Sequence, residues 1–140
     1  MDETPKYFKM CIEAKKIQEE WEPKAFDLYF DKYNLLIKHY NPSTKDEKIK
    51  HWQVKENMIW LPYQDQLQNL LGVYKNEIYI LISDFFNFAW DEPMPSHYIP
   101  REPKSSSMEQ LWLRFVMFEL YSKKWDDKNE TWVKQNIKEK

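Results

Sequence analysis

The stretch SMEQLWLRFVMFELYSKKW, residues 107–125, limits the possible folds more than any other part of the chain. Ser107 with Gln110 three residues later is a capping-box pattern, which marks a helix start. The apolar residues that follow have helical spacing but cover more than one side of the helix: Met108, Leu111, Trp112, Phe115, Val116, Phe118 and Leu120. A helix of this kind has to be covered from several directions. We therefore expect it to be the central, best-buried element.

A second helix is expected near the start of the chain. Thr4 followed by Pro5 is a favourable helix start, because the threonine side chain accepts an unpaired N–H and proline is tolerated in the first turn. Apolar residues then recur at alternating spacings of three and four, and they form one row: Tyr7, Met10, Ala14, Ile17 and Trp21. The row predicts a helix that ends near Pro23 and packs on a core, with a short coiled coil as the alternative.

Strands are expected between residues 26 and 61. The apolar residues of the first strand alternate with positions 27, 29 and 31, the period of a strand with one buried face, and they are Phe26, Leu28 and Phe30. Turn residues at 31–34 lead into a second apolar run at 35–40, so a hairpin is expected. The segment from His51 to Leu61 completes a predicted antiparallel sheet of about three strands.

The other segments are assigned by their polar, apolar and proline content. Residues 41–50 are predicted to be a polar loop, and the proline-rich residues 91–106 an extended connection. Segment 76–90 has helical spacing but many β-branched and aromatic residues, so we expect a helix and keep a strand as the alternative.

Together these elements predict one domain, residues 1–140, of the α+β class. A chain of 140 residues has the size of one ordinary domain with its own core. We expect the small antiparallel sheet to be packed by the N-terminal helix and the long C-terminal helix.

Charge and cysteine content restrict the partners and the compartment. The formal net charge is −2 and neither half of the chain is basic, so nonspecific binding to a phosphate backbone is not indicated. Cys11 is the only cysteine, which rules out an intrachain disulfide and a thiolate-clustered zinc site. No apolar run approaches the roughly 20 residues of a membrane helix, and no export signal is apparent. We therefore expect a cytoplasmic protein without a membrane partner.

The histidines and the glycine content give no catalytic motif. His39, His51 and His97 lie in different predicted segments and lack the spacing of a metal site. A single glycine, Gly72, rules out a Gly-rich phosphate loop. Cys11 lies on the inner half of a predicted helix, where a small buried thiol is more common than a nucleophile.

Two groups of carboxylates are the remaining candidates for chemistry. Asp27 and Asp31 with Lys32 are similar to the cluster of metal-dependent nucleases, but solvated positions on a strand and its turn explain them more simply. A second group has carboxylates beside an imidazole, which suits acid–base chemistry, and consists of Asp91, Glu92 and His97. A solvated connection explains that group too. The sequence predicts no catalytic residue, no metal ligand and no cofactor.

Aromatic side chains are abundant in the predicted sheet. Four of them suit a face that stacks nucleic-acid bases: Tyr29, Tyr33, Tyr40 and Trp52. Such a face normally accompanies a basic groove, which this chain lacks, so we expect these rings in the core. Aromatic residues that stay exposed would anchor a protein interface.

The segment WLPYQDQLQNLLG, residues 60–72, is predicted to be an amphipathic helix that begins at Pro62. Gly72 is expected to end it in the left-handed conformation. The apolar side is expected to carry Tyr63, Leu67, Leu70 and Leu71. The outer side carries amides and one carboxylate. Polar side chains of this kind are expected on any solvent-exposed helix face, with or without a function. It is nevertheless our candidate partner-binding surface, made of Trp60, Tyr63, Gln64, Asp65 and Gln68.

Three motifs in a fixed order carry a resemblance. They are KMCIEAKKIQEEWEPK at 9–24, WLPYQDQLQNLLG at 60–72 and SMEQLWLRFVMFELYSKKWDD at 107–127. With them the chain resembles short uncharacterised proteins encoded in phages and prophages of low-GC Gram-positive bacteria. It departs from that pattern with Ala25-Phe26-Asp27 in place of an expected Gly-Asp, and with Tyr63 in place of an expected Arg. The resemblance implies a phage or prophage accessory protein of the host cytoplasm, without an assigned activity.

We expect a non-enzymatic module that binds or modulates a host or phage protein. The alternative is a nucleic-acid-associated protein of phage replication or regulation. A small metal-dependent enzyme is the third hypothesis. The sequence does not indicate the oligomeric state.

Overall fold

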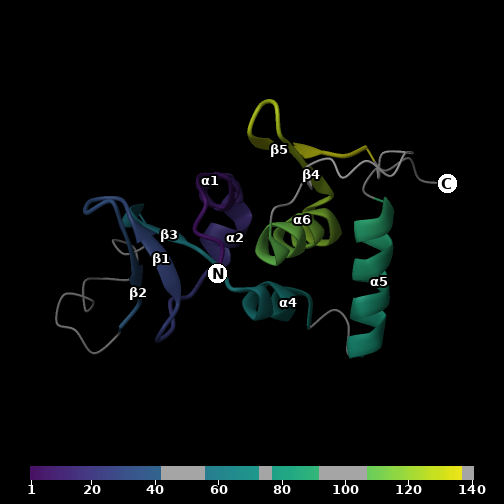
Figure 1. Cartoon of the computed structure of the whole chain (residues 1–140), viewed down its shortest axis with the longest axis horizontal. Coiled ribbons are helices and arrows are strands. Elements are labelled where there is room, and N and C mark those ends of the chain that lie inside the picture. The colour runs from purple at the N-terminus through teal and green to yellow at the C-terminus, as the bar shows by residue number, and fades with distance from the viewer. Residues whose placement is uncertain (42–55, 73–76, 92–106, 137–140) are drawn as a thin grey trace. The chain divides into compact units, whose positions relative to one another are not determined.

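The computed structural model describes residues 1–41, 56–72, 77–91 and 107–136 (Figure 1). The chain divides into two units, Glu3–Tyr63 and Gln64–Lys140, and residues 1 and 2 belong to the second unit. Helices occur together with small antiparallel sheets, so the predicted α+β class is confirmed. The prediction of one domain over residues 1–140 stays a prediction.

Some of the predicted segments lie outside the described residues. The predicted polar loop is not described beyond Asn41, and the predicted proline-rich connection is not described beyond Asp91. Of the predicted third strand, only the part from Glu56 onward is described.

The N-terminal helix is broken into α1 (Pro5–Glu13) and α2 (Lys15–Glu20). The predicted start is confirmed, because the Thr4 side chain accepts a hydrogen bond from the Tyr7 N–H. The predicted continuous helix is wrong at Ala14, whose ψ of 61° is not helical. Periodicity does not reveal this break, because the apolar row continues across it into the same core.

The Glu3–Tyr63 unit contains a three-stranded antiparallel sheet of order β2-β1-β3, shown side by side in Figure 1. Its strands are β1 (Leu28–Asp31), β2 (Leu36–His39) and β3 (Met58–Trp60), as the sequence predicts in outline. Side chains pack on the sheet from α1, where Phe8 meets Phe30 with ring centroids 4.4 Å apart.

The predicted single buried face of the first strand is wrong in part. Phe26 is 78% exposed and has a φ of 70°, whereas Asp27 is buried. The Asp27 Oδ2 accepts hydrogen bonds from Trp21 Nε1 and from the Lys24 backbone N–H, both at 2.9 Å. These bonds satisfy the carboxylate inside the protein and leave Phe26 outside.

The sheet aromatics are divided between core and surface. Tyr29 and Tyr40 are buried and meet edge to face, with ring centroids 6.5 Å apart. Their predicted place in the core is confirmed. The same prediction is wrong for Tyr33, which is exposed on the turn between the strands. Trp52 lies outside the described residues.

The turn between β1 and β2 is held by one aspartate. The Asp31 Oδ1 accepts hydrogen bonds from the backbone N–H groups of Tyr33 and Asn34, at 2.9 and 3.2 Å. The Asn34 Nδ2 donates to Asp31 Oδ2 at 2.7 Å. Leu35 then turns the chain with a φ of 56°, the left-handed conformation that glycine usually supplies.

The Gln64–Lys140 unit is built around α6 (Met108–Tyr121), so the predicted central helix is confirmed. Its buried residues lie on more than one side: Gln110, Trp112, Leu113, Arg114, Phe115, Val116 and Met117. The helix α4 (Gln64–Gly72) packs on α6 and buries Leu67 and Leu71. The predicted left-handed cap is wrong, because Gly72 is the last helical residue and has no positive φ.

Segment 76–90 forms the helix α5 (Ile78–Asp91), which confirms the expected helix over the strand alternative. It packs on α6 through aromatic rings. Phe85 stacks on Trp112 with centroids 3.8 Å apart, and Phe88 lies 5.2 Å from Phe115.

The chain after α6 forms a hairpin of β4 (Lys123–Asp126) and β5 (Thr131–Lys134). Trp125 and Trp132 are partners across it, with centroids 5.1 Å apart. The turn repeats the geometry of the first one: Asp126 accepts from the N–H groups of residues 128 and 129, and Glu130 has a φ of 50°.

Candidate functional site

The residues of the predicted partner-binding surface belong to both units. Trp60 and Tyr63 end the Glu3–Tyr63 unit, and Gln64, Asp65 and Gln68 begin the other. Trp60 is buried and stacks on Trp21, so it offers little surface to a partner.

The amide part of that surface lies on the first turns of α4. Asp65 is exposed, while Gln64 and Gln68 are half-buried. The carboxylate of Asp65 suits the positive end of the helix dipole whether or not it binds a partner. The contact role of these three side chains stays a prediction.

Exposed apolar side chains also lie on α5, where they form a continuous row. Ile78, Ile82 and Phe86 are spaced by four residues, which places them above one another on one side of the helix. Ile78 is 72% exposed and Ile82 55% exposed. Tyr79 widens the row and is also exposed. We call these four residues the α5 stripe.

The α5 stripe borders the side of α5 that packs on α6. Leu81 is buried and Phe85 is stacked on Trp112, so one apolar side of the helix is used for packing. The apolar surface continues beyond that contact into the stripe. Isolated exposed apolar residues are common, but a contiguous row usually marks an interaction surface.

The charges on α5 have one sign. Between residues 77 and 91 the charged residues are Glu77, Asp84 and Asp91, with no lysine, arginine or histidine. A hydrogen bond with Glu77 raises the pKa of Tyr79, so this phenol stays protonated and neutral at physiological pH. The helix thus combines exposed apolar side chains with negative charge.

The sequence analysis identifies this helix but not its exposed side. Helical spacing is shared by Ile78, Leu81, Ile82, Phe85 and Phe86 and predicts a helix, but it does not say which side of the helix is covered. What indicates an interface is that the apolar side chains of α5 cover more of the helix than one neighbouring helix can bury. This comparison requires the structure, because the sequence does not show that α6 is the neighbour.

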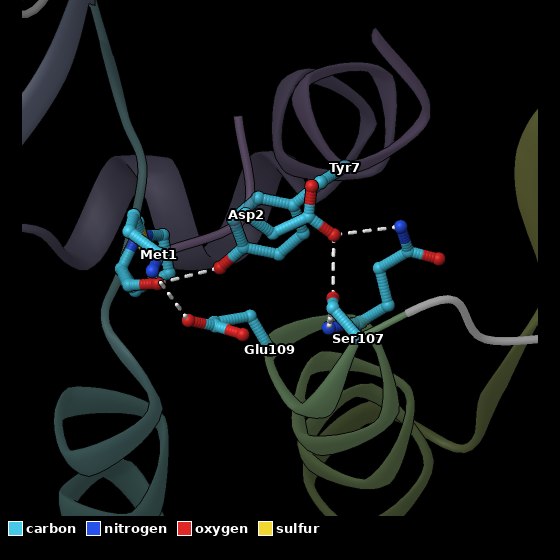
Figure 2. A network of polar contacts seen from close by, with 7 residues as sticks. Met1, Asp2, Tyr7, Ser107 and Glu109 are labelled. Carbon is cyan, nitrogen blue, oxygen red and sulfur yellow. Dashed lines mark hydrogen bonds and ion pairs between the residues drawn. The ribbon is translucent and has the colours of Figure 1, made fainter. Parts of the chain in front are cut away.

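A network of polar contacts, partly buried, lies at the start of α6 (Figure 2). The Asp2 carboxylate accepts hydrogen bonds from Ser107 Oγ and, at 2.7 Å, from Gln110 Nε2. Ser107 Oγ accepts the Gln110 backbone N–H, which confirms the predicted cap. The Met1 amino nitrogen lies 3.6 Å from Glu109 Oε1. The network neutralises the exposed N–H groups and dipole of a helix start, which is a structural role.

Two carboxylates considered for catalysis, Asp27 and Asp31, instead make structural hydrogen bonds and an ion pair. Asp27 binds the Trp21 indole, and Asp31 Oδ2 lies 3.0 Å from Lys38 Nζ. Burial acts to raise the pKa of Asp31, but hydrogen bonds from Lys38, Asn34 and the turn backbone outweigh it and lower the pKa to about 2. Such an acid stays ionised and does not transfer protons near neutral pH.

Metal-binding and thiol chemistry have no support within the described ranges. No three His, Cys, Asp or Glu residues there are grouped so as to hold a metal ion. Two histidines, His51 and His97, and Glu92 lie outside those ranges. Cys11 is buried, as the sequence predicts.

Within the part of the chain that the structure describes, no helix has both the length and the apolar character required to cross a bilayer. No protein-family model matches the chain, and no curated protein or solved structure matches it significantly. Function is therefore argued from the surfaces themselves.

Proposed function

We propose that the protein is a non-enzymatic binding module and that the α5 stripe contacts a host or phage protein. The observation that carries the proposal is the exposure of Ile78 and Ile82 in one helical row. Burying such side chains against a partner releases about 25 cal/mol per Å² of apolar surface. A helix face of this kind fits a partner groove by its i, i+4 and i+8 side chains.

The charge of α5 specifies the chemistry of the partner surface. Because the helix carries acidic residues and no basic ones between 77 and 91, the complementary surface is apolar with a border of Lys or Arg. Nucleic acid is a poor match, since its phosphates would face Glu77 and Asp84. Protein is the class of partner that this surface favours.

The setting of the proposal is a phage or prophage accessory protein in the host cytoplasm. The three sequence motifs support this setting through the resemblance that they carry. A small accessory protein acts by occupying a surface on another protein, which requires an exposed binding face and no catalytic group.

The test is capture of the partner from a lysate of a phage-infected or lysogenic host, after nuclease treatment. The full chain and its Ile82→Glu variant are immobilised, and the retained proteins are identified by mass spectrometry. Ile82→Glu places a charge in the middle of the stripe, so retention of the same protein should fall at least about tenfold, which corresponds to about 1.4 kcal/mol. Val133→Glu is the matched control, because Val133 is exposed on a strand outside α5.

Three outcomes are informative. Loss of capture in Ile82→Glu but not in Val133→Glu supports the stripe. Equal capture by both variants contradicts it, and a Gln64→Ala, Gln68→Ala double variant then tests the predicted amide surface. Loss of all capture on nuclease treatment would instead point to a nucleic-acid-associated protein.

A further inference from the structure

Among the described residues, no strand pairs with the outer edge of the three-stranded sheet at β2. Tyr40 donates its N–H to Asp27 O at 2.7 Å and accepts from Phe26 N at 2.8 Å, so its backbone groups face β1. The antiparallel register pairs Lys38 with Tyr29, and backbone direction alternates along a strand. The N–H and C=O groups of Ile37 and His39 therefore point away from β1.

The open edge is also apolar. Leu36 is 57% exposed and Ile37 is 38% exposed, and Leu35 in the adjoining turn is exposed as well. Natural sheets usually protect an edge with charge, proline or a covering element, because an open edge pairs with other strands. On β2 the one lysine, Lys38, is held by Asp31 and does not protect the edge.

At the opposite edge of the same sheet, a side chain binds the outward backbone groups of Trp60. The Gln18 Nε2 donates to the Trp60 carbonyl oxygen at 2.9 Å, and Gln18 Oε1 accepts the Trp60 N–H at 2.8 Å. The amide thus makes both hydrogen bonds that a neighbouring strand would make with this residue of β3. The sheet can be extended on the β2 side, while Gln18 occupies the β3 edge at Trp60.

We propose that a second copy of this chain pairs with β2 through its own β2, antiparallel about a two-fold axis. Ile37 lies opposite the Ile37 of the second copy, and their outward N–H and C=O groups exchange hydrogen bonds. Leu36 then lies opposite Lys38 of the second copy, whose ammonium group is neutralised by Asp31 at 3.0 Å. A register with Lys38 opposite its own copy would place like charges side by side.

The assembly stops at two copies. A two-fold contact uses the same surface on both molecules and consumes the open edge of each. The two edges of the joined sheets that remain are the β3 edges, where Gln18 occupies the backbone groups of Trp60. The contact involves only a short strand, so the dimer forms and dissociates with concentration, as small interfaces do.

Sedimentation equilibrium of the full chain over a wide range of concentrations tests the proposal. We expect a monomer–dimer equilibrium with no larger species. Ile37→Lys puts like charges opposite each other at the two-fold axis, so the dissociation constant should rise at least about tenfold. Val133→Lys, on an exposed strand position of the other sheet, should leave it unchanged.

A second measurement does not depend on any variant. In a mixture of differently isotope-labelled copies, intermolecular NOEs should connect the α-protons of Leu36 and Lys38, which lie close in a pair without direct hydrogen bonds. A monomer at all concentrations, species larger than dimers, or an equal effect of Val133→Lys overturns the proposal. Because Ile37 is not part of the α5 stripe, Ile37→Lys should retain the captured partner, and the two proposals fail separately.

Discussion

At the scale of single residues, Leu35 and Glu130 show how this chain makes tight turns almost without glycine. Both have a positive φ, which costs an L-residue about 1–2 kcal/mol. In each turn an Asp-x-x-Asn sequence precedes the strained residue and supplies side-chain hydrogen bonds to the backbone. Those bonds hold the turn in a shape that the strained residue alone disfavours.

Glycine at either strained position should stabilise the protein. We expect Leu35→Gly and Glu130→Gly each to raise the free energy of unfolding by about 0.5–1 kcal/mol, since the relief of strain exceeds the extra entropy of the unfolded chain. Urea denaturation followed by circular dichroism measures the change. Lys128→Gly is the control in the same kind of turn, because Lys128 has no positive φ and should show no gain. A loss of stability in both first variants would contradict the argument.

The Asp31 carboxylate makes stability depend on pH in the acid range. Its pKa is lowered from 3.8 to about 2 in the folded protein, so the folded state binds its proton less readily than the unfolded state does. The stabilisation of the folded state by ionised Asp31 is complete above pH 3.8 and is lost as the pH falls toward 2. An NMR titration of the Asp31 side chain should show this low midpoint, and Lys38→Met should move it upward. An unchanged midpoint in that variant would mean that Lys38 does not lower the pKa.

At the scale of elements, one side chain compensates for a broken helix and closes a sheet edge. At the break, the Cys11 carbonyl accepts the Ala14 N–H at 3.2 Å and Gln18 Nε2 at 3.1 Å. The same amide binds both backbone groups of Trp60. The sequence shows Gln18 only as a polar position between apolar ones, because its partners are distant in the chain.

Removing the Gln18 amide should destabilise the protein. We expect Gln18→Ala to lower the free energy of unfolding by about 2 kcal/mol, because the Trp60 N–H and carbonyl lose the Gln18 amide and the Cys11 carbonyl loses one of its donors. Thermal or urea denaturation measures the loss. Lys15→Ala, at an exposed position of α2, is the control and should change stability by less than about 0.5 kcal/mol. Equal effects of the two substitutions would refute the proposed role.

At the scale of the whole molecule, the two units carry different surfaces. The Glu3–Tyr63 unit has the open β2 edge, and the Gln64–Lys140 unit has the α5 stripe. The proposed self-association and the proposed partner binding therefore involve separate residues, and each proposal is tested by its own substitution. A small binding protein with a dimer contact apart from its partner contact presents two copies of the binding face, which strengthens binding to a repeated or dimeric target.

The kinds of element and the central position of α6 follow from the sequence alone, because caps and apolar periodicity depend on residues a few positions apart. The Ser107 cap, the helix at 78–91 and the antiparallel sheet are of this type. The break at Ala14, the exposed side of α5 and the contact between Gln18 and Trp60 were decided by tertiary structure. Each of these depends on which distant residues supply packing and hydrogen bonds, and local spacing does not encode that choice.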